Sequence, residues 1–138
     1  MCGNFRRTAR TLTHLYDQAL RPRGLRATQF TILQFLSLAG EVSQGQLGEM
    51  LAMDSTTLTR TLQIMGRQRW IAERPGKDRR ERWLRLARAG EKQLKRALPA
   101  WEKVQSRVRR QVGGQAWKNL PQLTNQVTEL LTMEGDSI

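Results

Sequence analysis

The sequence predicts a mainly α-helical protein with one small β-hairpin. Apolar residues recur at helical steps of three and four along most of the chain, and glycine or proline punctuates the boundaries between these segments. The stretch from 70 to 86 differs, because it alternates like two strands joined by a turn. A chain of 138 residues has the length of one domain, so we expect a single domain over residues 1–138.

The first two helices are expected at about 4–20 and from about Thr28 onward. In the first, five apolar residues step by four, three, four and four positions and so share one face: Phe5, Ala9, Leu12, Tyr16 and Leu20. Proline and glycine within 21–24 should end this helix. The second is apolar on more than one side, so it should lie between other elements.

Two further helix starts lie close together at Ser43 and Asp54. Ser43 and Gln46 have the spacing of a capping box, and Asp54 can cap a helix that follows a tight turn at Ala52 and Met53. Helix, tight turn and helix make a helix-turn-helix, a motif whose second helix can enter the major groove of DNA.

The second helix of this motif has an apolar and a polar face. Leu58, Leu62 and Met65 recur at steps of four and three and should face the core. Hydroxyl groups and an arginine can bond to base edges or phosphates, so the polar side chains of the first two turns are candidate DNA contacts: Ser55, Thr56, Thr57, Thr59 and Arg60. The alternative is an ordinary amphipathic helix with a threonine-rich exposed face.

A basic hairpin follows directly. Strands are expected at 70–74 and 82–86, and the turn between them carries Lys77, Arg79 and Arg80. A helix-turn-helix followed by such a hairpin is a winged helix, whose wing lies along the DNA backbone or enters the minor groove. We therefore predict a winged helix-turn-helix module over about 28–88, with a solvated surface loop as the alternative for the hairpin.

Two more helices are expected within 89–133, separated at Gly113 and Gly114. Pro99 should kink the first, Pro121 interrupts the apolar stripe of the second, and the tail from 134 to 138 should fray. The stripes are Leu94, Leu98, Trp101, Val104, Val108 and Val112, then Trp117, Leu120, Leu123, Val127, Leu130 and Leu131.

The small module cannot cover these stripes alone. We therefore expect the helices at 4–20 and 89–133 to be dimerisation helices that interlock in a twofold homodimer, which would place two recognition helices about one DNA turn apart. The alternative is that they close a bundle within one chain.

The charge of the chain favours an anionic partner. Lysine and arginine number 24 against 12 acidic residues, so the formal net charge is +12, which suits nucleic acid or an acidic membrane surface. The sequence has no apolar run long enough to cross a bilayer and no cleavable signal pattern. Double-stranded DNA is therefore the expected partner, with no membrane contact and a cytoplasmic location.

Nothing in the sequence indicates an enzyme. With one cysteine and one histidine, a zinc site has too few ligands, and the acidic residues show no recognisable catalytic pairing. The sequence also lacks a glycine-rich phosphate loop and a nucleophile elbow. We expect neither catalytic activity nor a cofactor or metal.

The order of elements and three segments resemble the MarR family of bacterial winged-helix transcription regulators. The segments are 24–30 at the entry to the second helix, 47–60 in the helix-turn-helix, and 78–90 from the wing to the long helix. Within them Asp54, Thr57, Leu58 and Arg60 stand at matching places, as do the wing residues Asp78, Arg79 and Arg80. The resemblance covers nearly the whole chain.

The resemblance implies a homodimeric regulator, usually a repressor of stress, efflux or catabolic genes. Such proteins often leave DNA when a small aromatic or phenolic compound binds or a cysteine is oxidised. By position, the turn Ser55–Thr57 with Arg60 would meet the major groove, Arg80 would enter or border the minor groove, and Arg79 and Lys77 would lie near phosphates. Asp78 would orient the wing arginines.

Two departures from the family pattern concern helix starts. Arg26 stands where the family commonly has threonine, so the cap of the second helix is expected to move to Thr28. Ala87 likewise replaces a threonine before the long helix, which removes a cap of about 1 kcal/mol.

Three residues are candidates for sensing. His14 and Tyr16 lie on the first helix, which borders the effector cleft in proteins that this one resembles, although a surface histidine and a packed tyrosine are the favoured interpretation. Cys2 could sense oxidation, since Arg6 and Arg7 could stabilise its thiolate, but only another chain could supply a resolving cysteine.

The sequence thus favours a sequence-specific, dimeric DNA-binding regulator that binds a pseudo-palindromic operator and is released by a small molecule or by oxidation. The alternative is a non-specific architectural protein of the nucleoid, for which the charge of +12 would suffice. A third hypothesis is a redox or ligand sensor that acts on a protein partner.

Overall fold

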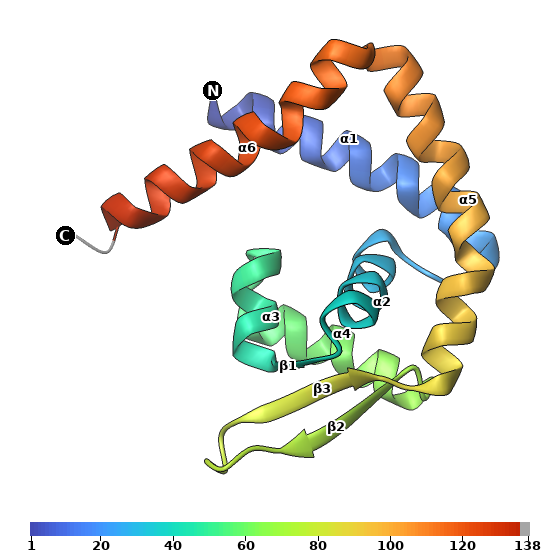
Figure 1. The fold of residues 1–138 in the computed structure, drawn as a ribbon, viewed down its shortest axis with the longest axis vertical. Helices are drawn as coiled ribbons and strands as arrows, with labels where there is room; N and C mark the ends of the chain where they lie inside the picture. The colour runs from blue at the N-terminus through green and yellow to red at the C-terminus, as the bar shows by residue number, and fades with distance from the viewer. Residues whose placement is uncertain (136–138) are drawn as a thin grey trace. The chain divides into compact units, whose positions relative to one another are not determined.

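The computed structural model describes residues 1–135, the last two by their backbone alone, and confirms the mainly helical fold with a small hairpin (Figure 1). The chain divides into two compact units, and the second begins at Glu102. The elements are α1 (Cys2–Leu20), η1 (Arg21–Arg23), α2 (Ala27–Ala39), β1 (Glu41–Ser43), α3 (Gln44–Leu51), α4 (Ser55–Arg67), β2 (Ile71–Pro75), β3 (Arg82–Leu86), α5 (Arg88–Val112) and α6 (Gly114–Gly135).

The start of α2 differs from the prediction. The helix begins at Ala27, and its N-cap is Arg26 rather than Thr28. The backbone amide of Ala27 donates to Asp17 Oδ1 of α1 at 2.6 Å, and the amide of Arg26 donates to Gln29 Oε1 at 2.9 Å. Two side chains therefore satisfy two of the backbone amides at the start of α2 without a threonine cap.

The sheet contains a strand that the sequence did not reveal. Its order is β1-β3-β2, with both pairs antiparallel, so β3 lies in the centre. The hairpin strands fall where they were expected, with β2 shifted by one residue. β1 is only three residues long, too short for an alternating pattern, and joins the sheet through pairs such as Val42 with Leu84.

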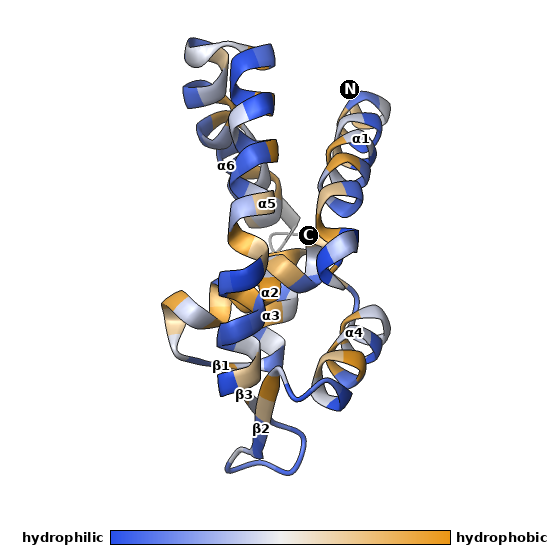
Figure 2. Ribbon diagram, turned by 90° about the vertical axis from the view of Figure 1, so that its right-hand side faces the viewer, coloured by the Kyte–Doolittle hydropathy of each residue, from blue (hydrophilic) through white to orange (hydrophobic). Residues whose placement is uncertain are grey.

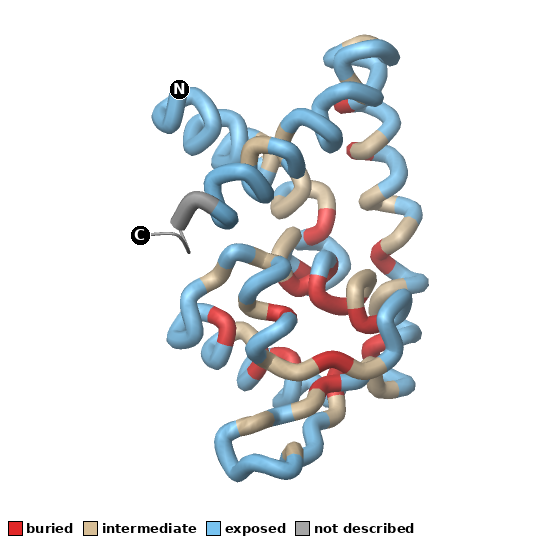
Figure 3. The backbone as a smooth tube through the Cα atoms, turned by 60° about the vertical axis from the view of Figure 1, so that its left-hand side comes forward, coloured by how far each residue is buried: buried red, intermediate tan, exposed pale blue. Residues whose placement is uncertain are grey.

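The hydrophobic core lies in the first unit, where α2, α4 and the sheet meet. Phe30, Ile32, Leu33 and Leu36 of α2 are all buried, as expected for a central helix, and α2 is among the most apolar elements in Figure 2. Figure 3 shows that the hairpin tip is exposed and that the buried segments lie away from it. The core therefore fixes α4 and the base of the hairpin and leaves their outer faces free.

In the second unit, α5 ends at Val112 and Gly113 follows with φ 91°, so the predicted break is confirmed. α6 continues through Pro121 without interruption and reaches Gly135, two residues into the tail that was expected to fray. The rest of that tail, residues 136–138, lies outside the described residues. Across residues 1–135, the helices all fall short of the length and apolarity that a bilayer crossing needs.

Candidate nucleic-acid interface

Reciprocal hydrogen bonds fix the helix-turn-helix. The amide of Gln46 donates to Ser43 Oγ at 3.2 Å, and the amide of Ser43 donates to Gln46 Oε1 at 3.1 Å, so the predicted capping box is confirmed. Ala52 ends α3 in the left-handed conformation with φ 48°. Asp54 then caps α4, because Asp54 Oδ2 accepts from the Thr57 amide at 2.9 Å.

The outer face of α4 collects most of the predicted contact residues. Leu58, Leu62 and Met65 are at most 2% exposed and anchor the inner face. A shallow depression on the outer face is lined by Ser55, Thr56, Thr59, Arg60 and Gln63. Gln63 was missed by the sequence argument, which stopped after two turns, although its spacing of four residues from Thr59 would have placed it on this face.

Thr57 departs from this group. Its hydroxyl donates to Asp54 Oδ1 at 2.6 Å while its amide donates to the other carboxylate oxygen. Hydrogen bonds from Thr57 lower the pKa of Asp54, and the bond from its hydroxyl has a larger effect than the bond from its amide. Thr57 is therefore engaged in the cap, and its hydroxyl proton is already committed.

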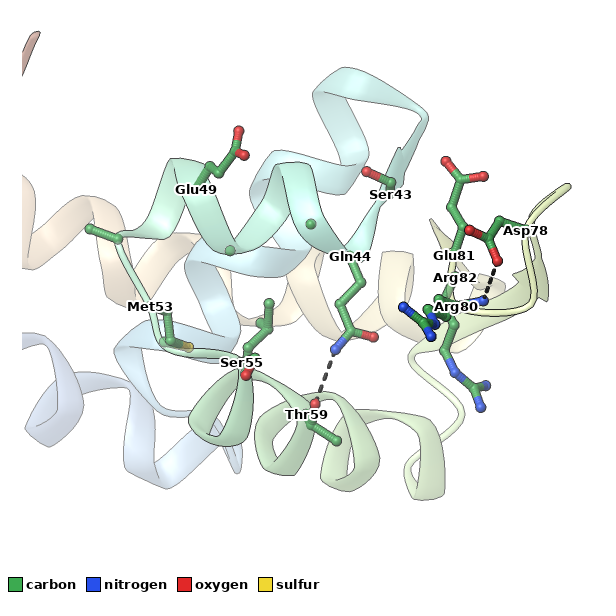
Figure 4. A pocket seen from close by; sticks show the side chains of 14 residues that line it. Ser43, Gln44, Glu49, Met53, Ser55, Thr59, Asp78, Arg80, Glu81 and Arg82 are labelled. Atoms are coloured by element: carbon green, nitrogen blue, oxygen red, sulfur yellow. Dashed lines mark hydrogen bonds between the residues drawn. The ribbon is translucent and has the colours of Figure 1, made fainter. Parts of the chain in front are cut away.

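A groove of about 990 Å³ separates α3 and α4 from the hairpin (Figure 4). Gln44 of α3 donates from Nε2 to Thr59 Oγ1 at 3.1 Å, which ties the two helices together along one wall. The other wall carries Arg80 and Arg82, together with two acidic residues. The full lining is Ser43, Gln44, Gly45, Gly48, Glu49, Ala52, Met53, Ser55, Leu58, Thr59, Asp78, Arg80, Glu81 and Arg82.

The hairpin tip has a defined turn. The Arg80 amide donates to Asp78 Oδ1 at 3.2 Å, and the Glu81 amide donates to the Asp78 carbonyl at 3.0 Å. Lys77, Arg79 and Arg80 are exposed, and none of them forms an ion pair with another described residue. Beside the acidic residues Asp78 and Glu81, the tip thus presents three cations that form no ion pair with the described residues.

The paired strands β2 and β3, which we call the base of the wing, hold their cations differently from the turn, although Arg74 and Arg82 lie in the last two strand pairs before it. Arg74 Nε donates to both carboxylate oxygens of Glu41, at 3.0 and 3.1 Å, and Nη2 also contacts the carboxylate. The Arg74 guanidinium lies 5.3 Å from the ring centre of Trp83. The hydrogen bond lowers the pKa of Glu41 and raises that of Arg74. Arg82 pairs with Glu73 at 3.2 Å.

The predicted sensing residues lie apart from one another on α1. His14 is exposed and shares a hydrogen bond of 2.9 Å with Gln18 on the same helix. Tyr16 is half-buried, with its ring centre 6.5 Å from that of Trp101, and burial raises its pKa. Cys2 is exposed at the start of the helix. Trp101 also stacks on Phe30 at 5.5 Å, which makes it a core residue.

Comparison with known proteins gives consistent matches. Residues 23–81 match the sequence profile of the MarR family. The crystal structure of the M. tuberculosis transcriptional regulator MosR in complex with DNA is 34% identical, with a TM-score of 0.79 over 94% of this chain and 96% of that one. A cysteine-to-serine variant of E. coli MarR bound to operator DNA has a TM-score of 0.78 over 89% of both chains; at 19% identity it shows a likeness of fold alone.

A Bacillus subtilis protein, the uncharacterized HTH-type transcriptional regulator YwoH, is 29% identical over 85 residues. That match covers 62% of this chain and 62% of the relative, so this chain spans just under two thirds of that protein's length.

Proposed function

This chain belongs to the MarR family of winged helix-turn-helix transcription regulators, and we propose that it binds a pseudo-palindromic DNA operator as a homodimer and represses transcription from it. The observation that carries the proposal is the pairing of a polar outer face on α4 with an ordered wing tip whose three cations form no ion pair with the described residues. A bacterial regulator that acts on chromosomal DNA would work in the cytoplasm.

In this proposal α4 reads the major groove. Ser55, Thr56 and Thr59 offer hydroxyl groups to base edges or phosphates, and Arg60 supplies the bidentate contact that guanine favours. Gln63 joins them because it lines the same depression. Thr57 supports the N-terminus of α4 by donating its hydroxyl hydrogen bond to the capping residue Asp54.

The wing would reach the adjacent backbone and minor groove. Arg80 is assigned to the minor groove, where negative potential attracts arginine, and Lys77 and Arg79 to phosphates. Asp78 is assigned to orienting these cations, because its carboxylate holds the Arg80 amide.

Exposed apolar side chains support the homodimer. α6 leaves several of its large apolar residues open to solvent, with exposed fractions from 39% to 72%: Leu120, Leu123, Leu130, Leu131 and Met133. Phe5 on α1 and Val112 on α5 are each 43% exposed. A second copy would remove these surfaces from water, which favours association.

Release from DNA is proposed to follow binding of a small aromatic or phenolic compound or oxidation of Cys2. The half-buried Tyr16 ring beside Trp101 offers aromatic surface to such a compound, and His14 lies two residues before it on α1. Cys2 is exposed and would be reachable by an oxidant.

The decisive experiment is selection of binding sites from random duplex DNA by the purified protein at near-physiological salt. An enriched inverted repeat with half-sites about one helical turn apart is expected. Strong, salt-dependent binding with no enriched motif would instead establish the second candidate, an architectural DNA-binding protein, which the net charge of +12 favours.

The variant Arg60→Ala separates the two candidates further. Loss of a base contact should relax preference at one position of the operator and weaken binding by about tenfold, within the usual range for such contacts. Equal weakening on every sequence would identify Arg60 as a phosphate contact only. Competition between operator and scrambled duplexes measures the difference.

A further inference from the structure

We propose that three arginines at the junction of α4 and α5, namely Arg67, Arg69 and Arg88, form a second contact with the phosphate backbone of duplex DNA. We refer to them as the junction cluster. All three are exposed, and none forms an ion pair with another described residue. The proposal rests on the proposed function, because it adds a contact to the same DNA beyond those of the reading face and the wing tip.

A backbone hydrogen bond joins the segment that carries Arg69 to the segment that carries Arg88. The Ala87 amide donates to the Trp70 carbonyl at 2.9 Å, so the residue before Arg88 is bonded to the residue after Arg69. A side chain at Gly90 would place its Cβ 2.0 Å from that same carbonyl oxygen. The first turn of α5 therefore sits tightly against the end of α4, and the spacing of the cations is set by the fold.

Arg69 occupies a position that its side chain does not favour. Its φ is 59°, in the left-handed region, and its amide donates to the Gly66 carbonyl at 2.9 Å while the Trp70 amide donates to the Met65 carbonyl at 3.0 Å. This pair of bonds is the usual ending of a helix at glycine, because a side chain in the left-handed conformation is strained. A folding requirement alone would favour glycine at position 69.

Arg88 also runs against a local preference. It is the first residue of α5, where the helix dipole favours an acidic group, and Glu91 is the acid of that turn. Two departures from local stability rules thus meet at one place. Such coincidences are typical of sites that serve a function other than folding.

One member of the cluster, Arg67, continues the reading face of α4, and the other two lie on the segments that follow α4 and begin α5. Arg67 lies seven residues, or two turns, after Arg60, so the two side chains leave the helix on nearly the same side, about 10 Å apart along its axis. That separation corresponds to about three nucleotides of one strand at 3.4 Å each. Phosphate is the proposed ligand because exposed arginines beyond the reading residues offer charge and N–H donors to the DNA backbone.

The test is the variant Arg69→Gly, which removes the charge and the strain together. We expect the slope of log affinity against log salt to fall by about 0.9 per protomer, because each phosphate contact releases roughly that many counterions. The order of preferred sequences should stay unchanged. The melting temperature should stay equal or rise, so weaker binding cannot be ascribed to damage of the fold.

Matched variants make the outcome decisive. Arg69→Lys keeps the charge and should keep the salt slope, and Arg10→Ala removes one cation from α1 and should leave the slope unchanged. Arg88→Gln should reproduce the loss seen with Arg69→Gly. An unaltered slope in Arg69→Gly, or an equal loss in Arg10→Ala, would overturn the proposal.

The slopes are measured on the selected operator and on a random duplex of equal length. Failure of the wild type to prefer any sequence would contradict the proposed operator binding. The comparison of slopes on the random duplex would still decide the junction cluster.

Discussion

The tip and the base of the wing both carry basic side chains, but those at the base form ion pairs and those at the tip do not pair with the described residues. At the base, Arg74 and Arg82 are each paired with a carboxylate, and Arg74 also lies against Trp83. At the tip, Lys77, Arg79 and Arg80 stand on a turn held by Asp78 and make no ion pair with the described residues. The base uses its cations to shape the sheet, and the tip keeps its cations for an external anion.

The register of the sheet explains how Arg74 reaches both Trp83 and Glu41. In the order β1-β3-β2, Arg74 on β2 pairs in register with Trp83 on the central strand. The guanidinium passes over that ring and reaches Glu41 on the far strand. One side chain thus links all three strands on the outer face of the sheet. This contact couples the wing to β1, and through β1 to the helix-turn-helix that follows it.

The largest expected effect is that of Arg80→Ala. Losing a tip cation that forms no ion pair within the described residues should lower DNA affinity by about tenfold or more, within the range for a lost groove contact. Arg74→Ala is the matched control, because it removes the same side chain from the base of the same hairpin. Fluorescence anisotropy on the operator measures both, and an equal loss in the two variants would break the distinction between tip and base.

Asp78→Ala should have a smaller effect, a loss of a few-fold in affinity, because the turn loses the acceptor of the Arg80 amide. Asp78→Asn keeps an acceptor oxygen while removing the charge, so it should bind at least as well as the wild type. If instead Asp78 only repelled DNA, both variants would bind more tightly. The comparison of the two isolates the orienting role from the charge.

Local sequence rules predicted the parts of the site that local contacts determine. The caps at Ser43 and Asp54 and the span of β3 follow from spacing within a few residues, and the structure confirms them. The inner face of α4 also follows its helical period.

Contacts between distant segments could not be predicted from such rules. The Asp17 carboxylate caps α2 across ten residues of sequence, and Glu41 meets Arg74 across 33. β1 is likewise recognisable only by its pairing with β3. Thr57 was considered only as a candidate DNA contact, and the bond from its hydroxyl to the Asp54 cap was not predicted from the sequence.

The smallest expected effect is a pH dependence of stability at the wing base. The Arg74 hydrogen bond lowers the pKa of Glu41 below its ordinary value of 4.5. A carboxyl whose pKa is lower in the folded state stabilises the fold above its unfolded pKa, and this contribution is lost as pH falls through the folded pKa. Glu41→Gln removes it, and because Arg74 is exposed and Glu41 is partly exposed the change in melting temperature near neutral pH should be small.

The difference in melting temperature between wild type and Glu41→Gln should therefore be present at pH 6 and shrink as the pH approaches 3, as thermal denaturation followed by circular dichroism would show. Arg74→Gln should give the same pattern, since either substitution removes the pair. A difference that stayed constant with pH would mean that Glu41 stabilises the sheet by packing, and the base of the wing would then not depend on ion pairing.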